Sequence, residues 1–167
     1  MSIKINYIPL IIVLTLLFCH NIYAGDSPYQ LIWSKTNNPS NSHDTARGVA
    51  IDSSAIYIVG DDFSLGSNSQ WRIEKRDLSS GTTIWVQVNN PSNNGDGAYG
   101  VTIDSTGVYV IGSDLIQGGS DCQWRIEKRN LNTGNIIWTK TSNPSNSADY
   151  PYGVAVDTTG IYIVGSD

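Results

Sequence analysis

The chain contains few of the side chains that usually catalyse reactions. Its 167 residues include two histidines, two cysteines and two glutamates, Glu74 and Glu127, and no G-x-S-x-G, H-E-x-x-H or C-x-x-C motif. Those motifs carry nucleophile, zinc-protease and dithiol chemistry. Cys122 is the one cysteine beyond the amino-terminal segment, so no internal disulfide is expected there, and the residue is predicted to be a small buried filler. The composition favours a non-enzymatic protein.

Positive charge is also scarce. The chain carries 10 Lys and Arg against 15 Asp and Glu, a formal net charge of −5, and its basic residues form no cluster. Nucleic acid and anionic lipid surfaces attract proteins through clustered basic side chains. Neither is therefore expected as a partner.

The one long apolar run lies near the amino terminus. Tyr7–Cys19 follows a basic residue and spans 13 residues, which is too short to cross a bilayer comfortably. The pattern predicts a signal peptide over residues 1–24 with cleavage after Ala24, and hence a secreted, periplasmic or cell-surface protein. A lipidated Cys19 is the alternative, which the bulky Phe18 before it disfavours.

After a short leader at residues 25–30, the remainder, 31–167, is internally repetitive. Its motifs recur at offsets of 52 and then 53 residues. Gly48–Asp52 returns twice, as Gly100–Asp104 and Gly153–Asp157, and the heptapeptide QWRIEKR occurs at Gln70–Arg76 and Gln123–Arg129. A fixed period of this length is typical of stacked repeat architectures.

Each repeat reads as four short strands separated by Gly-, Ser- and Asn-rich turns. In the first complete repeat these are Gly48–Asp52, Ala55–Gly60, Gln70–Leu78 and Thr82–Val88. No 3.6-residue periodicity is present, so the pattern predicts an all-β fold. Four antiparallel strands in about 50 residues is the signature of a β-propeller blade.

The strand pattern also predicts which faces are covered. Stacked blades cover inner strands on both sides, so Val49 and Ile51 of the first strand and the non-alternating run Ile56–Val59 of the second strand are expected to be buried. On the third strand Arg72, Glu74 and Arg76 share one face, because strand side chains alternate. Their alternating signs predict a solvated outer strand. A basic binding patch is the alternative, which the intervening glutamate disfavours.

Two motifs resemble known propeller repeats. Gly48–Asp52 followed by Ile56–Gly60 resembles the bacterial and archaeal β-propeller repeat family often found in exported proteins. Ser80–Trp85 and Thr133–Trp138 are similar to the Thr-Gly-x-x-x-Trp blade motif of quinoprotein-type propellers. The resemblance implies that one tryptophan per repeat docks between neighbouring blades, namely Trp33, Trp85 and Trp138. Quinoprotein dehydrogenases often have an adjacent cysteine pair, which this chain lacks, so no quinone cofactor is expected.

The repeats do not make up a whole ring. The chain enters the repeat in an outermost strand, Leu31–Lys35, and ends after a second strand. It therefore holds eleven predicted strands, or about 2.75 blades, whereas propellers close with four or more. Either the chain is the front of a longer protein, which is favoured, or copies self-associate to complete a ring.

The long connections are expected at one edge of the blades, because adjacent strands run in opposite directions. They are Asn37–Ala46, Asn89–Ala98 and Ser142–Pro151, together with Asp61–Ser69 and Ser113–Cys122. The opposite edge has only tight turns, in which Asp52, Asp104 and Asp157 are predicted to be turn residues. Long loops on a rigid scaffold usually carry function.

Three repeated positions at this edge hold acidic or aromatic residues. The first has Asp44, Asp96 and Asp149, the second has Asp62, Asp114 and Asp167, and the third has Tyr99 and Tyr152 where the first repeat has Arg47. Clustered carboxylates suit a calcium ion held by Asp44, Asp96 and Asp149. Carboxylates beside tyrosine rings instead suit a polyol or sugar. The alternative is structural, because Asp in such loops often closes its own backbone turn.

The sequence thus favours an exported β-propeller repeat protein that binds a protein or carbohydrate partner through its long-loop edge. One alternative is the amino-terminal part of a propeller enzyme, either a quinoprotein-like dehydrogenase or a carbohydrate-active enzyme. Another is a lectin-like ring built from several copies. Propellers host many unrelated activities, so the fold alone does not choose among them.

Overall fold

The computed structural model describes residues 2–7, 29–92, 94–115, 121–145 and 147–167, and every helix or strand element within them is a β-strand. The chain divides into an amino-terminal unit, Met1–Thr36, and a main unit, Asn37–Asp167. The prediction of an all-β fold is confirmed.

The amino-terminal unit contains one antiparallel strand pair. Strand β1 (Ser2–Tyr7) pairs with β2 (Tyr29–Lys35). The predicted signal peptide, residues 1–24, falls largely outside the described residues, of which only Ser2–Tyr7 belong to it. Cleavage after Ala24 and export stay predictions from the sequence.

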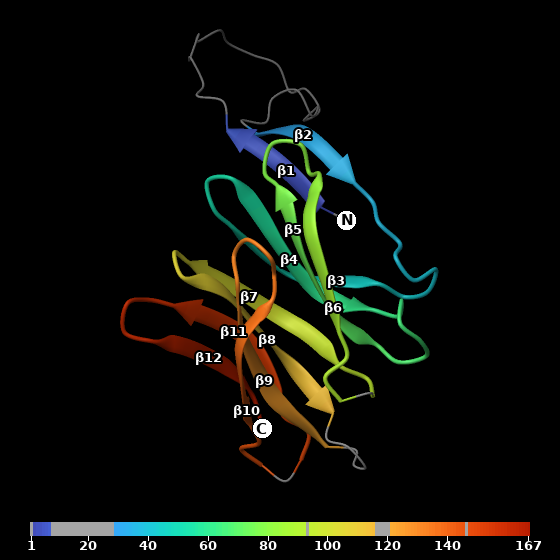
Figure 1. Ribbon diagram of the computed structural model, residues 1–167, viewed down its shortest axis with the longest axis vertical. Helices are drawn as coiled ribbons and strands as arrows, with labels where there is room; N and C mark the ends of the chain where they lie inside the picture. Colours follow the sequence, from blue (N-terminus) through green and yellow to red (C-terminus); the bar gives the residue numbers. More distant parts are fainter. Residues whose placement is uncertain (1, 8–28, 93, 116–120, 146) are drawn as a thin grey trace, which may run out of the picture. The chain divides into compact units, whose positions relative to one another are not determined.

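The main unit consists of two four-stranded sheets and one hairpin (Figure 1). All of their strand pairs are antiparallel, and sequential strands are neighbours, as the four-strand pattern predicts. The first sheet contains β3 (Thr45–Ile51), β4 (Ala55–Asp62), β5 (Gln70–Asp77) and β6 (Thr83–Asn89). The second sheet contains β7 (Gly97–Asp104), β8 (Gly107–Leu115), β9 (Cys122–Arg129) and β10 (Ile136–Ser142). The hairpin contains β11 (Tyr150–Val156) and β12 (Ile161–Ser166).

Aspartates close the tight turns between the first two strands of each repeat. Asp52 Oδ1 accepts hydrogen bonds from the backbone N–H groups of Ser54 and Ala55, both at 2.7 Å. Asp104 and Asp157 make the same contacts in the later repeats. The three residues therefore act as turn residues, as predicted, and the long connections lie at the opposite edge, called here the long-loop edge.

The sheets of the main unit stack face to face. Strand β7 packs against β3, β4 and β5 of the first sheet, and β11 packs against β7, β8 and β9 of the second. One apolar cluster fills the space between the first two sheets, with Tyr57 and Val59 from β4 and Val101, Val108 and others from the second sheet. The predicted burial of the second strand on both sides is confirmed for Ile56, Tyr57 and Val59.

The predicted burial of the innermost strand is wrong for β3. Val49 is 66% exposed and Ile51 is 64% exposed, whereas Val101, at the position equivalent to Val49, is 9% exposed. Within the main unit no described sheet packs on this face of β3, while the first sheet covers the same face of β7. Burial at this position therefore depends on a neighbouring sheet.

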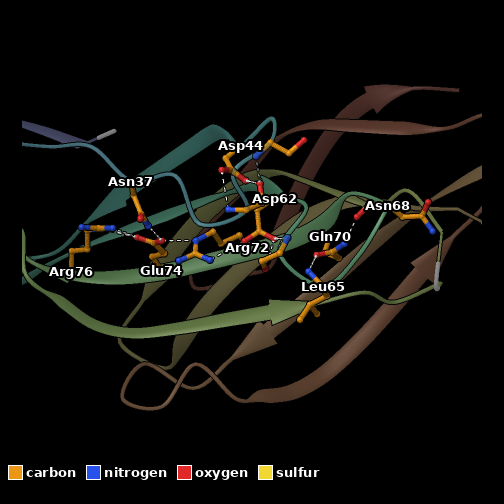
Figure 2. A network of polar contacts seen from close by, with 12 residues as sticks. Asn37, Asp44, Asp62, Leu65, Asn68, Gln70, Arg72, Glu74 and Arg76 are labelled. Carbon is orange, nitrogen blue, oxygen red and sulfur yellow. Dashed lines mark hydrogen bonds and ion pairs between the residues drawn. The ribbon is translucent and has the colours of Figure 1, made fainter.

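The predicted solvation of the charged heptapeptide is also wrong. Glu74 and Arg76 of β5 are buried, and in β9 Glu127 is 0% exposed and Arg129 is 2% exposed. In the first sheet, Glu74 accepts from Arg72 Nε at 2.5 Å and from Arg76 Nε at 2.6 Å, with Asn37 above it (Figure 2). The charges are tolerated inside because each one is paired and hydrogen-bonded.

The same charge ladder in the second sheet meets the first sheet directly. Glu127 accepts from Arg125 Nε and Arg129 Nε, both at 2.8 Å. Asn89, at the end of β6, donates to Glu127 Oε1 at 3.2 Å, and Arg129 Nη1 donates to the Gly134 carbonyl at 2.9 Å. Burial lowers the pKa of Arg129, an effect that Glu127 opposes. The repeated heptapeptide thus supplies a buried ion-pair ladder to each sheet.

Tryptophans cross from one sheet to the next. Trp71 is fully buried, and its Nε1 donates to the Ser113 carbonyl at 3.0 Å. Gly112 leaves room for this ring, because a Cβ there would lie 2.6 Å from Trp71 Cζ2. Trp124 makes the equivalent bond to Ser166 at 3.3 Å.

Of the three tryptophans expected to dock between blades, Trp85 makes a hydrogen bond to the next sheet. Trp85 Nε1 donates to the Leu131 carbonyl of the second sheet at 3.2 Å. Trp85 and Trp138 also share a contact within their own sheets, because their rings lie 6.3 Å from the Tyr57 and Tyr109 rings respectively. Trp33 lies on β2 in the amino-terminal unit. Within the main unit, the tryptophans that contact the next sheet are thus Trp85, Trp71 and Trp124.

Candidate functional site

The first strand of each repeat in the main unit carries a β-bulge at the long-loop edge. In β3 the pairing register shifts between Ala46 and Gly48, and β7 and β11 shift at the equivalent step. The extra residue is Arg47 in β3, Tyr99 in β7 and Tyr152 in β11. A bulge leaves one residue out of the ladder and redirects its side chain, frequently next to a functional site. These three residues are called the bulge row.

A polar residue near the end of the second strand holds each bulge side chain. The partner is acidic where the bulge residue is arginine and is a serine where it is tyrosine. The pairs are Arg47 with Asp61, Tyr99 Oη with Ser113 Oγ at 3.2 Å, and Tyr152 Oη with Ser166 Oγ at 3.3 Å. The bulge position and its partner position on the second strand therefore change together from repeat to repeat. As a result, every bulge side chain has a polar partner that holds it in place.

The bulge row is continuous from one repeat to the next. Arg47 Cζ lies 5.1 Å from the centroid of the Tyr99 ring, which is a cation–π distance. The Tyr99 ring lies 6.5 Å from Tyr152 and 6.3 Å from Tyr150 between ring centroids, tilted or edge-on, within the range of favourable aromatic pairs. Tyr152 is 61% exposed. The row therefore presents one cation and an open aromatic surface side by side.

The protonation of the groups around the row follows from their neighbours. The hydrogen bond to Asp61 raises the pKa of Arg47 despite its partial burial, so the guanidinium stays charged. Burial raises the pKa of Cys122, and a hydrogen bond to the Cys122 thiol raises the pKa of Tyr150. Cys122 is buried and is a poor nucleophile in this form, which agrees with its predicted role as a filler.

The loop aspartates close their own loops. Asp96 is almost completely buried and accepts hydrogen bonds from Ser92 Oγ at 2.8 Å and from the Leu115 N–H at 3.0 Å. Burial raises the pKa of Asp96, and these hydrogen bonds oppose that shift. The same pairing four residues apart joins Ser40 to Asp44 at 2.6 Å and Ser145 to Asp149 at 2.9 Å. These contacts are the ones expected if the aspartates stabilise loops, which was the structural alternative to a ligand site.

The remaining acidic candidates belong to the ion-pair ladders. Asp62 accepts from Arg72 Nη1 at 2.8 Å (Figure 2), and Asp114 accepts from Arg125 Nη1 at 3.1 Å. Across the described ranges no three His, Cys, Asp or Glu side chains form a group that could hold a metal ion. The calcium site expected from Asp44, Asp96 and Asp149 stays a prediction from the sequence.

Among the residues predicted for the site, the structure therefore brings Tyr99 and Tyr152 together. It adds Arg47 and Tyr150 to them, which the sequence reasoning did not propose as site residues. The arginine was visible as the first-repeat counterpart of the tyrosines. In the later repeats, tyrosine replaces Arg47 and serine replaces Asp61. This paired replacement was the sequence signal that could have assigned Arg47 to the same site.

No protein-family model, curated protein or solved structure matches the chain. No helix long and apolar enough to cross a membrane occurs in the part of the chain that the structure describes.

Proposed function

We propose that this chain is an exported, non-enzymatic binding module that holds a carbohydrate against the bulge row. The observation that carries the proposal is the repeated placement of Arg47, Tyr99 and Tyr152. Each sits at a bulge, each has a polar support, and they contact one another along one edge. A core-filling role would not require Tyr152 to remain 61% exposed.

The row has the chemistry that sugars require. Tyrosine rings pack against the apolar face of a pyranose and also offer a phenolic hydroxyl. The Arg47 guanidinium carries fixed hydrogen-bond donors for sugar oxygens. The carboxylate of Asp61 beside it is an acceptor for sugar hydroxyls. A surface with few polar groups beside aromatic side chains is typical of small-molecule sites.

The proposed architecture is that of β-propeller blades in an incomplete ring. It is supported by four-stranded antiparallel sheets that stack face to face, with innermost strand β7 against β3 and β11 against β7. In such a ring the innermost strands surround the axis. The bulge row would then lie around one mouth of the central channel, where residues from several blades can reach one ligand.

The proposal is tested by titrating the full chain with cellohexaose, chitohexaose and maltohexaose in a calorimeter. At least one of these neutral oligosaccharides is expected to bind. Tyr152→Ala should weaken that binding at least about tenfold, or about 1.4 kcal/mol, because it removes the exposed ring. Tyr152→Phe should retain most of the affinity, because the stacking surface remains.

Ile137→Ala is the matched control, because Ile137 is 52% exposed on the outermost strand β10 and lies outside the row. It should leave the affinity unchanged. Failure of all three oligosaccharides to bind at millimolar concentration contradicts the proposal. So does binding that survives Tyr152→Ala intact.

A further inference from the structure

Two apolar surfaces of the main unit are exposed at opposite ends of the stack of sheets. The leading face is defined by Val49 and Ile51 of β3, which are 66% and 64% exposed. The trailing face is defined by Tyr162 and Val164 of β12, which are 53% and 68% exposed. Large apolar side chains gathered on one face usually mark an interaction surface.

Inside the chain, the equivalents of these two faces pack against each other. Tyr57 and Val59 of the first sheet correspond to the trailing face, and both are fully buried. Val101 and Ile103 of the second sheet correspond to the leading face, and they join the same apolar cluster as Tyr57 and Val59. The two exposed faces are therefore the two halves of an interface that the chain already forms internally.

The two faces of the internal interface are also complementary in shape, because the innermost strands β3 and β7 approach each other closely. A Cβ on Gly48 would lie 3.1 Å from the Tyr99 carbonyl oxygen and 3.2 Å from Gly100 Cα, both in the next sheet. Gly153 occupies the same position in the hairpin, where the one described atom within reach is Val164 Cγ2 of the hairpin itself. The trailing face thus keeps the slim surface that receives an innermost strand elsewhere in the chain.

We propose that the trailing face of one molecule binds the leading face of a second copy of this chain. The occupant is identified by the internal interface, because Val101 and Ile103, which pack in one cluster with Tyr57 and Val59, hold the repeat positions equivalent to Val49 and Ile51. The association is heterologous, with different surfaces meeting head to tail, so successive copies can add to form a ring or an open stack.

The test measures the mass of the full chain by sedimentation velocity over a concentration series. The wild-type chain is expected to associate as its concentration rises. Val164→Asp and Val49→Asp should each weaken association about 100-fold, because either one buries an unpaired carboxylate in the interface. Both positions are exposed, so each variant should keep the melting temperature of the dilute wild-type chain.

Mixing the two variants gives the sharpest result. The intact trailing face of the Val49→Asp chain can bind the intact leading face of the Val164→Asp chain. An equimolar mixture should therefore form a two-chain complex and nothing larger. Ile137→Asp is the control outside both faces and should associate like the wild type.

Three outcomes overturn the proposal. A wild-type chain that remains monomeric at every concentration shows that the faces do not bind each other. Self-association of either variant alone shows that like faces meet, or that another segment such as the amino-terminal apolar run is responsible. A mixture that stays monomeric shows that the two faces are not complementary.

Discussion

The second sheet and the hairpin contain equivalent residues of the repeat, but the exposure of these side chains differs between them. In the second sheet Tyr109 is 5% exposed and Ile111 is fully buried. At the equivalent positions of the hairpin, Tyr162 and Val164 lie more than half exposed. The apolar character of the two positions is the same, so the difference comes from what packs against them. The hairpin covers the second sheet, while in the described residues no further sheet covers the hairpin.

The local structure, by contrast, is unchanged between the two. The Thr106 N–H donates to Asp104 Oδ1 at 2.7 Å in the second sheet, and the Thr159 N–H donates to Asp157 Oδ1 at 2.7 Å in the hairpin. Strand pairing and bulge position are also equivalent. Turn chemistry is encoded within one repeat, whereas burial requires two repeats in contact. Substitutions should therefore separate the two contributions.

The largest effect is expected where the second sheet buries charge. Glu127→Ala would leave Arg129, which is 2% exposed, without its main ionic partner. Breaking a buried ion pair on one side costs about 3–5 kcal/mol, so the free energy of unfolding in urea should fall by that amount. The double variant Glu127→Leu with Arg129→Met should lose less than the sum of the two single losses. A loss below about 1 kcal/mol for Glu127→Ala contradicts a buried ladder.

A smaller effect compares one residue type in covered and uncovered sheets. Val59→Ala removes buried methyl groups and should cost about 2–3 kcal/mol. Val164→Ala, at the equivalent but exposed position, should stay within about 0.5 kcal/mol. Urea unfolding should be followed at a concentration where the chain is monomeric. Equal losses at the two positions would show that the hairpin is covered in solution.

The smallest effect should be the same in both regions, because it arises within the turns. Hydrogen bonds from Thr106 lower the pKa of Asp104 although burial acts to raise it, and the Thr159 hydroxyl lowers the pKa of Asp157. A lowered pKa means that the folded state favours the carboxylate. The stability it contributes is therefore present above the ordinary value of 3.8 and is lost as the pH falls through the lowered pKa.

Nuclear magnetic resonance of the side-chain carboxyl carbons checks this prediction directly. Both aspartates should titrate below 3.8. Thr106→Ala and Thr159→Ala should each move the affected pKa upward, since each removes a hydroxyl donor. A titration of Asp157 at or above the ordinary value would contradict the turn geometry in the hairpin.

Features that depend on neighbouring residues in the sequence could be predicted closely. The strand expected at Ala55–Gly60 extends over Ala55–Asp62, and the strand expected at Gln70–Leu78 covers Gln70–Asp77. Alternation and turn chemistry are local signals. The all-β class and the order of four antiparallel strands follow from them together with the period of the repeat.

Features that depend on packing between repeats were harder to predict. The alternating charges of Arg72, Glu74 and Arg76 are typical of solvated strands, and the covering residues come from other segments, such as Asn37 over Glu74. The bulge row shows the same limit. Tyr99 and Tyr152 could be selected from the sequence as a repeated aromatic position, but a bulge is defined only by the pairing of two strands.

The reach of Trp71 into the space left by Gly112 is repeated by Trp124 and Gly165, so each junction carries its own matched pair. Every junction in the main unit is therefore specified by residues that travel with a repeat when the coding sequence is duplicated. Recombination between near-identical segments could add or remove one whole repeat and leave the surviving junctions intact. The number of repeats can therefore change in evolution at little structural cost. Point substitutions of the junction residues, by contrast, carry a structural cost.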